Sequence, residues 1–307
     1  MTSIQWTEQT WNPTTGCDRI SPGCRNCYAL TMAKRLKGMG QAKYQNDGDS
    51  RTSGPGFALT VHTDVLTEPL RWKKPRKVFV NSMSDLFHAR VPREFLARVF
   101  AVMAATPQHT YQILTKRPER AARILTDLCI CGRGCVPGHH FRSEMEWAAT
   151  PHSPTYVPGL KHGIYHRSAW PLPNVWIGTS IESAQYVRRA NALRQTPAAV
   201  RFISAEPLLG SLNDLSLTAI DWLIIGGESG PGARPLEPWW IADLIHQARQ
   251  TGAAPFVKQM GSVWARNTFA DGKSVAAWGD TKGGHPAYWP APLRVREYPT
   301  APAAADV

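Results

Sequence analysis

The chain has 307 residues, of which 43% are hydrophobic and 19% charged, so it can bury a core and is not globally disordered. Its formal net charge of +12 favours a polyanionic partner such as nucleic acid. No apolar run is long enough to span a membrane, and the first residues lack the features of a secretory signal. We therefore expect a cytoplasmic protein without membrane contact, whose six cysteines serve metal or redox chemistry.

Short apolar runs alternate with helical patterns along most of the chain. Segments such as 78–80 and 222–225 are continuously apolar, which is typical of strands buried on both faces of a parallel sheet. An apolar stripe after Pro92 and a pattern that stops at Gly252 indicate helices between the runs. We expect strands at 57–62, 77–80, 110–114, 174–178, 200–203, 221–225 and 254–257. This alternation predicts a parallel α/β fold.

Polar residues cluster directly after five of the expected strands, at 81–85, 115–117, 179–182, 204–206 and 226–229. In a (β/α) barrel the carboxyl ends of the strands converge on one mouth, so we expect a shared site there. The candidates for catalytic or substrate contacts are Asp85, Lys116, Glu206 and Glu228. As an alternative, such carboxylates cap helices or lie in a first helical turn.

Cys17, Cys24 and Cys27 lie in a loop with Gly and Pro, and a helical pattern begins at Tyr28. Three thiolates in such a loop can bind a soft metal or an iron–sulfur cluster. A structural zinc site needs a fourth ligand, and none lies nearby in the sequence. We favour the cluster, with a zinc site completed from afar or three buried free thiols as alternatives. The positive end of the helix is expected to lower the pKa of Cys27.

Seven segments together carry a resemblance to a known family. They are WTEQTWNPTTGC (6–17), SPGCRNCYA (21–29), PLRW (69–72), VNSMSDLFH (80–88), ILTKRPER (113–120), EPLLG (206–210) and GGESG (226–230). The chain is similar to the phage Gp37/Gp68-type (DUF5131) family of radical S-adenosylmethionine (radical SAM) proteins, with a distant likeness to spore photoproduct lyase. The resemblance implies a partial TIM-type (β/α) barrel and a [4Fe–4S] cluster with one iron open to S-adenosylmethionine. It also implies that an electron from a donor such as flavodoxin or ferredoxin cleaves this cofactor to a 5′-deoxyadenosyl radical.

The resemblance also implies roles for particular residues. Cys17, Cys24 and Cys27 would be the ligands of the cluster. The residues that would hold S-adenosylmethionine are Ser84, Asp85, Lys116, Ser180, Glu182 and Tyr28. Two features depart from the superfamily pattern: the cysteine spacing is C-x6-C-x2-C instead of C-x3-C-x2-C, and the Gly-Gly-Glu segment at 226–228 follows a late strand. Because of the second departure, we expect Glu228 to face the substrate.

The region 126–172 interrupts a barrel that otherwise covers 1–265. It is rich in Pro, Gly and His and lacks a clear strand or helix period, so we expect a Cys/His-rich inserted loop. Its candidate metal ligands are Cys129, Cys131, Cys135 and His139. Tetrahedral Zn²⁺ is the simplest occupant, with a second iron–sulfur cluster or free thiols as alternatives. Residues 266–307 are expected to be a C-terminal extension with a frayed tail.

A basic segment at 71–77 contains five cations and Trp72, a composition that can grip phosphates while the indole stacks on a base. The same segment also fits a solvated loop on the side opposite the barrel mouth. Together with the resemblance, which implies a radical SAM enzyme, this segment makes nucleic-acid modification or repair one candidate activity. The alternative is a non-catalytic, zinc-stabilised nucleic-acid-binding protein.

Overall fold

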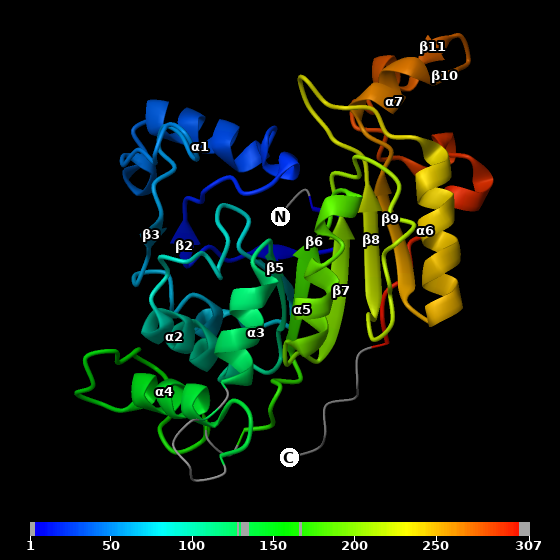
Figure 1. The fold of residues 1–307 in the computed structure, drawn as a ribbon. Helices are drawn as coiled ribbons and strands as arrows, with labels where there is room; N and C mark the ends of the chain where they lie inside the picture. The colour runs from blue at the N-terminus through cyan, green and yellow to red at the C-terminus, as the bar shows by residue number, and fades with distance from the viewer. Residues whose placement is uncertain (1–3, 128, 130–134, 166–167, 301–307) are drawn as a thin grey trace.

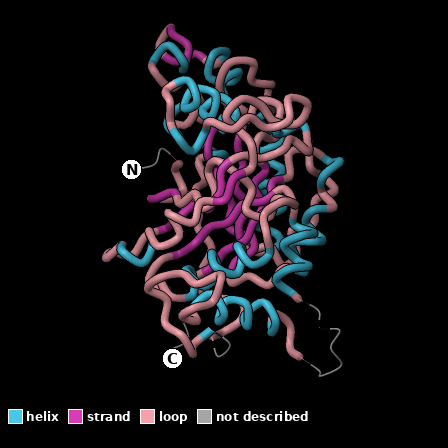
Figure 2. The backbone as a smooth tube through the Cα atoms, turned by 90° about the vertical axis from the view of Figure 1, so that its left-hand side faces the viewer, coloured by secondary structure: helices cyan, strands magenta, loops and turns pink. Residues whose placement is uncertain are grey.

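The computed structural model describes residues 4–127, 129, 135–165 and 168–300 and has a seven-stranded parallel sheet at its centre (Figures 1 and 2). In sheet order the strands are β1 (Gln9–Thr10), β4 (Lys77–Val80), β5 (Thr110–Thr115), β6 (Val175–Ser180), β7 (Val200–Ala205), β8 (Trp222–Gly226) and β9 (Ala254–Gln259). Each neighbouring pair is parallel. The sheet forms a half-barrel, which confirms the predicted α/β fold with a partial barrel of parallel strands.

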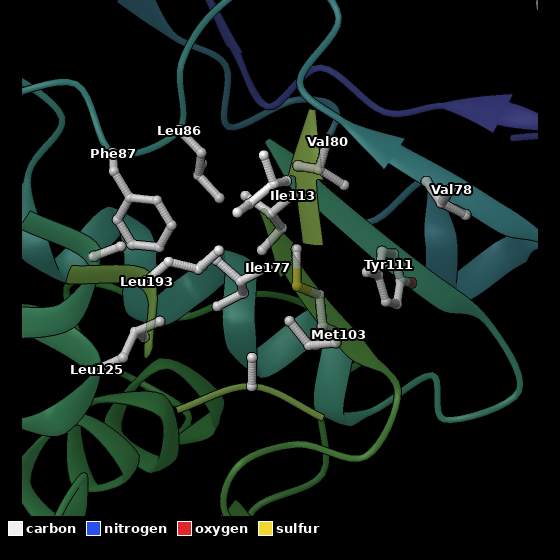
Figure 3. Packing of buried hydrophobic residues seen from close by; sticks show 14 of the residues in the cluster. Val78, Val80, Leu86, Phe87, Met103, Tyr111, Ile113, Leu125, Ile177 and Leu193 are labelled. Carbon is white, nitrogen blue, oxygen red and sulfur yellow. The ribbon is translucent and has the colours of Figure 1, made fainter. Parts of the chain in front are cut away.

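The two faces of the sheet bury different side chains because successive residues of a strand point in opposite directions. Val78 and Val80 of β4 pack into the larger core, together with residues of the helices, as Figure 3 shows. Phe79 lies between them and packs into a second cluster on the other face. That second cluster is mostly aromatic and consists of Trp6, Phe79, Trp176, Val200, Phe202, Trp222, Ile224 and Phe256. The inside of the half-barrel is therefore a packed core and not a pore.

Seven α-helices occur in the part of the chain that the structure describes. They are α1 (Tyr28–Gly38), α2 (Arg93–Ala104), α3 (Pro118–Thr126), α4 (His139–Ala149), α5 (Arg189–Gln195), α6 (Pro238–Thr251) and α7 (Ser262–Asn267). Short 3₁₀ helices include Pro22–Cys24, Ala42–Tyr44, Pro69–Arg71, Ala184–Tyr186, Val275–Trp278, Pro286–Tyr288 and Ala291–Leu293. Among the described residues, none of the helices combines the length and apolar character that crossing a membrane requires.

The strand expected at 57–62 is not part of the parallel sheet. Only β3 (Thr60–Val61) forms there, and it pairs in antiparallel fashion with β2 (Thr14–Thr15) in a separate two-stranded sheet. This small sheet lies beside α1 (Figure 1) and connects the first part of the chain to the segment before β4. The apolar run at 57–62 therefore supports the N-terminal loop and not the barrel, because Phe57 packs with Ala29 and Ala33 of α1.

The insertion contains a regular helix, contrary to our expectation. Helix α4 buries Phe141 and Met145 completely, and the Phe141 ring packs edge-on against Phe100 of α2 at 5.4 Å between centroids. Phe141, Met145, Ala148 and Ala149 recur at helical spacing, so the signal was present in the sequence. The insertion is thus anchored on the barrel through the same core that the other helices share.

The C-terminal extension returns to the sheet after a small hairpin of β10 (Phe269–Ala270) and β11 (Lys273–Ser274). Trp289 is 1% exposed and belongs to the main core, while the Tyr298 ring stacks on Trp222 at 5.4 Å. The extension therefore completes the hydrophobic core. The predicted frayed tail covers residues 300–307, of which 301–307 lie outside the described residues.

Candidate functional site

The carboxyl ends of β4, β5 and β6 meet the N-terminal cysteine loop, residues 16–27, at a cavity of about 160 Å³. We call this the cysteine cavity. Its walls include the predicted site residues Cys17, Cys24, Cys27, Tyr28, Ser84, Asp85, Lys116 and Ser180. These residues come from four separate parts of the chain, and the parallel topology brings them together as expected for the mouth of a (β/α) barrel.

Two hydrogen bonds to the backbone of Gly16 fix the position of the neighbouring Cys17 at the end of β4. The Gly16 N–H donates to the Met83 carbonyl at 2.9 Å, and the Ser84 hydroxyl donates to the Gly16 carbonyl at 2.6 Å. Gly16 has a φ of +84°, and a Cβ there would lie 2.1 Å from the carbonyl oxygen of Ala58. Only glycine therefore fits this turn. Ser84 is consequently a residue that positions the cysteine loop.

Asp85 connects β4 to β5 beneath the cavity. Its carboxylate accepts hydrogen bonds from the Thr115 hydroxyl at 2.7 Å, from the Lys116 backbone N–H at 3.0 Å and from the Arg117 guanidinium at 2.8 Å. The same Arg117 nitrogen lies 3.5 Å from the Cys17 sulfur. Asp85 thus holds Arg117 against the cysteine loop, and it leaves the Lys116 side chain at the cavity wall.

Two of the predicted carboxylates, Glu182 and Glu228, accept hydrogen bonds from the cysteine loop. Glu182 is fully buried, pairs with Arg189 at 3.0 Å and accepts the Gly23 N–H at 3.2 Å. Glu228 accepts the Asn26 amide at 3.1 Å and a bidentate pair of bonds from the Arg234 guanidinium at 2.5 and 2.8 Å. Neither carboxylate is among the residues that line the cysteine cavity. In this structure their contacts set the position of the loop that carries Cys24 and Cys27.

The electrostatic environment of the thiols differs from our expectation. Burial raises the pKa of Cys17 to about 12, and the nearby Asp85 carboxylate adds to this effect while Arg117 opposes it. Burial also raises the pKa of Cys27, although this residue is the N-cap of α1. The expected lowering by the helix end is therefore wrong in direction, because loss of hydration outweighs the helix N–H groups.

Asn81 is a site residue that the sequence reasoning missed. It is 3% exposed and lines the cavity, and its amide donates to the Thr14 hydroxyl at 2.6 Å. Its side-chain oxygen has no hydrogen-bond partner within the described part of the chain. A buried acceptor without a partner is costly, so this atom is suited to receive a donor from a ligand in the cavity. Its place as first residue of the polar cluster 81–85 was the available signal.

A family model for proteins described as "Protein of unknown function (DUF5131)" matches residues 1–285. The chain belongs to the DUF5131 family. This match supports the family named from the sequence, and the likeness to radical SAM proteins and spore photoproduct lyase stays a proposal. No curated protein and no solved structure matches the chain.

A larger cleft of about 1170 Å³ adjoins the cysteine cavity in this DUF5131 protein. Tyr28 and Ser82 line both spaces, and the Tyr28 hydroxyl donates to the Ser82 carbonyl between them. The far wall of the cleft comes from β9 and the C-terminal extension, with Lys258, Lys282 and Arg296 among its residues. Glu206 lies at this side, where it pairs with Lys258 at 3.0 Å.

The basic segment 71–77 precedes β4, at the opposite end of the sheet from the cysteine cavity. Trp72 packs edge-on against His109 at 5.6 Å, and the Arg76 guanidinium lies 5.8 Å from the Trp72 ring centroid. The half-buried indole is therefore engaged in packing within the protein. Lys73 and Lys74 are exposed, which agrees with the solvated-loop alternative.

The second cysteine group comes together only in part. Cys129, Cys135 and His140 offer ligand atoms that all lie within 4.8 Å of one another. His140, and not the predicted His139, belongs to this group. The two histidines are the first residues of α4, and their rings lie nearly perpendicular, with an interplanar angle of 81°. Cys131 lies outside the described residues.

Proposed function

We propose that this DUF5131 protein is a radical SAM enzyme, which binds an iron–sulfur cluster on Cys17, Cys24 and Cys27 and cleaves S-adenosylmethionine reductively. The observation that carries the proposal is that the three cysteines share one cavity with Lys116 and with the unpartnered oxygen of Asn81. The cavity lies at the carboxyl ends of parallel strands, where barrel enzymes carry their active sites.

The spacing of the three thiols supports a cluster over a single ion. Thiolates on one tetrahedral Zn²⁺ lie roughly 3.8 Å apart, given a Zn–S distance of about 2.3 Å. Among the described residues, the three-ligand group with all atoms within 4.8 Å is Cys129, Cys135 and His140, and the N-terminal cysteines do not form one. In a [4Fe–4S] cluster each thiolate binds a different iron, which suits ligands that share a cavity but stand farther apart.

The residues of the cavity divide into those that position the loop and those that are available to the cofactor. Ser84 and Asp85 use their side chains to hold Gly16 and Arg117. Lys116 supplies a cation suited to the carboxylate of S-adenosylmethionine, and Asn81 supplies an acceptor suited to its ammonium group. Ser180 is buried at the end of β6 and lines the same space.

The sizes of the two spaces support a cofactor that extends from one into the other. The cysteine cavity is smaller than the roughly 300–1,000 Å³ of typical small-molecule sites, whereas the adjoining cleft exceeds that range. Tyr28 stands at the boundary and is therefore placed to contact the adenosyl part. When bound, the cluster supplies one electron, received from a donor such as flavodoxin or ferredoxin, for cleavage of the cofactor.

We propose an anionic substrate, with nucleic acid as the favoured class. Lys282 is exposed on the cleft wall, which Arg296 also lines, while Lys258 in the same wall pairs with Glu206. A base that reacts in such a cleft must be single-stranded or turned out of its stack. Binding to single-stranded oligonucleotides should fall steeply as salt is raised, and Lys282→Glu should weaken it. Salt-independent binding would discard nucleic acid as the substrate.

Anaerobic reconstitution with iron and sulfide tests the enzyme proposal. We expect the iron and sulfide of one [4Fe–4S] cluster per chain, and 5′-deoxyadenosine from S-adenosylmethionine with a strong reductant. Cys24→Ala should lose the cluster, whereas the matched control Cys135→Ala, in the insertion, should keep it. If the wild-type protein takes up only zinc and yields no 5′-deoxyadenosine, the non-catalytic zinc-stabilised alternative replaces this proposal.

A further inference from the structure

A second group of soft ligands lies outside the cysteine cavity, at the junction of α3 and α4. The sulfurs of Cys129 and Cys135 and a ring nitrogen of His140 all lie within 4.8 Å of one another. The Cys129 sulfur is 2.9 Å from Nε2 of His140. In a tetrahedral zinc site, Zn–S of about 2.3 Å and Zn–N of about 2.0 Å separate such atoms by roughly 3.5–3.8 Å. A shift of well under 1 Å therefore converts the contact into a coordination geometry.

The scaffold fixes the position of His140. The Gly138 N–H donates to the Thr126 carbonyl at 2.8 Å and closes the base of the segment between α3 and α4. Gly138 is the N-cap of α4 with a φ of +76°, and a Cβ there would lie 2.3 Å from Nε1 of Trp170. Only glycine therefore fits the position before α4, and the backbone conformation there places His140 in the first turn of the helix.

Asp127 secures the same helix end from the other side. Its carboxylate accepts the Phe141 N–H at 2.8 Å, and Arg93 bridges it to Glu144 with contacts of 2.9 and 2.7 Å. Because Phe141 is fully buried in the core, the first turn of α4 is held rigidly. A rigid imidazole beside two thiols is a preorganised part of a metal site.

Residues 135–137, directly before α4, have little hydrophobic support of their own. Val136 is 58% exposed, and Pro137 is also exposed. Cys135 thus meets Cys129 and His140 where the described neighbours, Val136 and Pro137, contribute no apolar burial. A metal ion is the usual means of fixing such a segment, because binding contributes directly to folding.

We propose that Cys129, Cys135 and His140 bind one Zn²⁺ ion, which fastens Cys129 and Cys135 to the first turn of α4. Two thiolates and one imidazole match the preference of zinc, and a tetrahedral ion takes one further donor. The site is structural, and it is independent of the radical SAM proposal because none of its residues lines the cysteine cavity.

Metal analysis of the full-length chain tests the site with a matched pair of variants. After dialysis against Zn²⁺, His140→Gln and Cys129→Ser should each lose one zinc per chain, whereas the neighbouring His139→Gln should keep it. With Co²⁺ as the probe, the wild type and His139→Gln should show the sulfur-to-cobalt charge-transfer band, and His140→Gln should lack it. Equal zinc contents in His139→Gln and His140→Gln would overturn the proposal.

Two further measurements guard the interpretation. If a variant does not fold, wild-type protein treated with a strong chelator decides: loss of zinc should make the chain at residues 135–137 sensitive to a protease, and re-addition of Zn²⁺ should restore protection. Unchanged cleavage with and without Zn²⁺, or a Cys129–Cys135 disulfide under non-reducing conditions, would contradict the site. Cys24→Ala should keep this zinc, so failure of the cluster and failure of the zinc site are distinguished.

Discussion

At the scale of single residues, Lys116 carries the main prediction about the cofactor. It lines the cysteine cavity, while the neighbouring Asp85 carboxylate pairs with Arg117. Lys116→Met keeps the aliphatic stem and removes the charge. Because a hydrogen bond to a charged group contributes about 1.5–3 kcal/mol, we expect the affinity of the reconstituted protein for S-adenosylmethionine to fall about 10- to 150-fold. Lys73→Met, at the opposite end of the sheet, is the control, and equal affinities in equilibrium dialysis would contradict the role of Lys116.

The sequence could identify residues by type and spacing but not by the direction of their side chains. Cys17, Cys24 and Cys27 were predictable because their spacing is distinctive, and the polar clusters after the strands pointed to one edge of the sheet. The roles of Glu182 and Glu228 were not predictable. Their partners, Gly23 and Asn26, lie more than 150 residues away in the chain, and only the folded arrangement joins them. The same limit applies to the choice of His140 over His139.

At the scale of elements, the cysteine loop contacts the ion pair of the buried Glu228 and the partly exposed Arg234. Burial alone would raise the pKa of Glu228, but hydrogen bonds from Arg234 and Asn26 hold it below its usual range. Arg234→Met leaves a carboxylate that is 5% exposed without its cation, at a cost of about 3–5 kcal/mol in the free energy of unfolding. Urea denaturation should show this loss. Adding Glu228→Gln to Arg234→Met should recover part of the stability, and an unrecovered double variant would argue against an unpaired charge as the cause.

The turn between α2 and β5 makes stability depend on pH through His109. Its side chain is fully buried, and burial lowers its pKa. The folded state therefore keeps His109 neutral, while the unfolded chain takes up a proton near its ordinary pKa of about 6.5. Below that pH the unfolded state binds more protons, so the free energy of unfolding falls as the pH drops and is constant above it.

Urea denaturation at pH 7.5 and pH 5.5 checks this linkage. The stability lost between these two pH values should be smaller in His109→Gln than in the wild type. The exposed His246→Gln should behave like the wild type. His62 and His88 also have lowered pKa values, so a residual loss is expected in His109→Gln. Identical losses in the two variants would refute the contribution of His109.

Elements with a strong apolar period were predictable from the sequence. Very short strands, and the choice of which strands pair with each other, were not. Six strands of the sheet coincide with apolar runs that the sequence displayed, whereas β1 has only two residues, Gln9 and Thr10, and no such run. The run at 57–62 is equally apolar but serves the N-terminal loop, because its partner is β2 and not a barrel strand. The apolar pattern of a segment indicates that the segment is buried, whereas the strand with which it pairs depends on the whole fold.

At the scale of the whole molecule, the C-terminal extension joins the hydrophobic core to the wall of the cleft. Trp289 is 1% exposed, donates its indole N–H to the Gly283 carbonyl at 2.9 Å and lies 5.0 Å from the Arg296 guanidinium. Lys282, Gly284 and His285, which line the cleft, stand beside this anchor in the chain. The shape of the cleft therefore depends on a core contact made by one large side chain.

Trp289→Ala tests this dependence on two readouts. Removing a fully buried Trp should lower the free energy of unfolding by about 3–5 kcal/mol, because the space left behind is not refilled. Trp278→Ala is the matched control, since Trp278 is 48% exposed on the same extension and should cost less than about 1 kcal/mol. Below its melting temperature, Trp289→Ala should also bind oligonucleotides more weakly, because residues 282–285 lose their support. If both variants melt together and bind alike, the extension does not couple the core to the cleft, and the cleft wall must be held by the Arg296 contacts to Val257 and Gly284 instead.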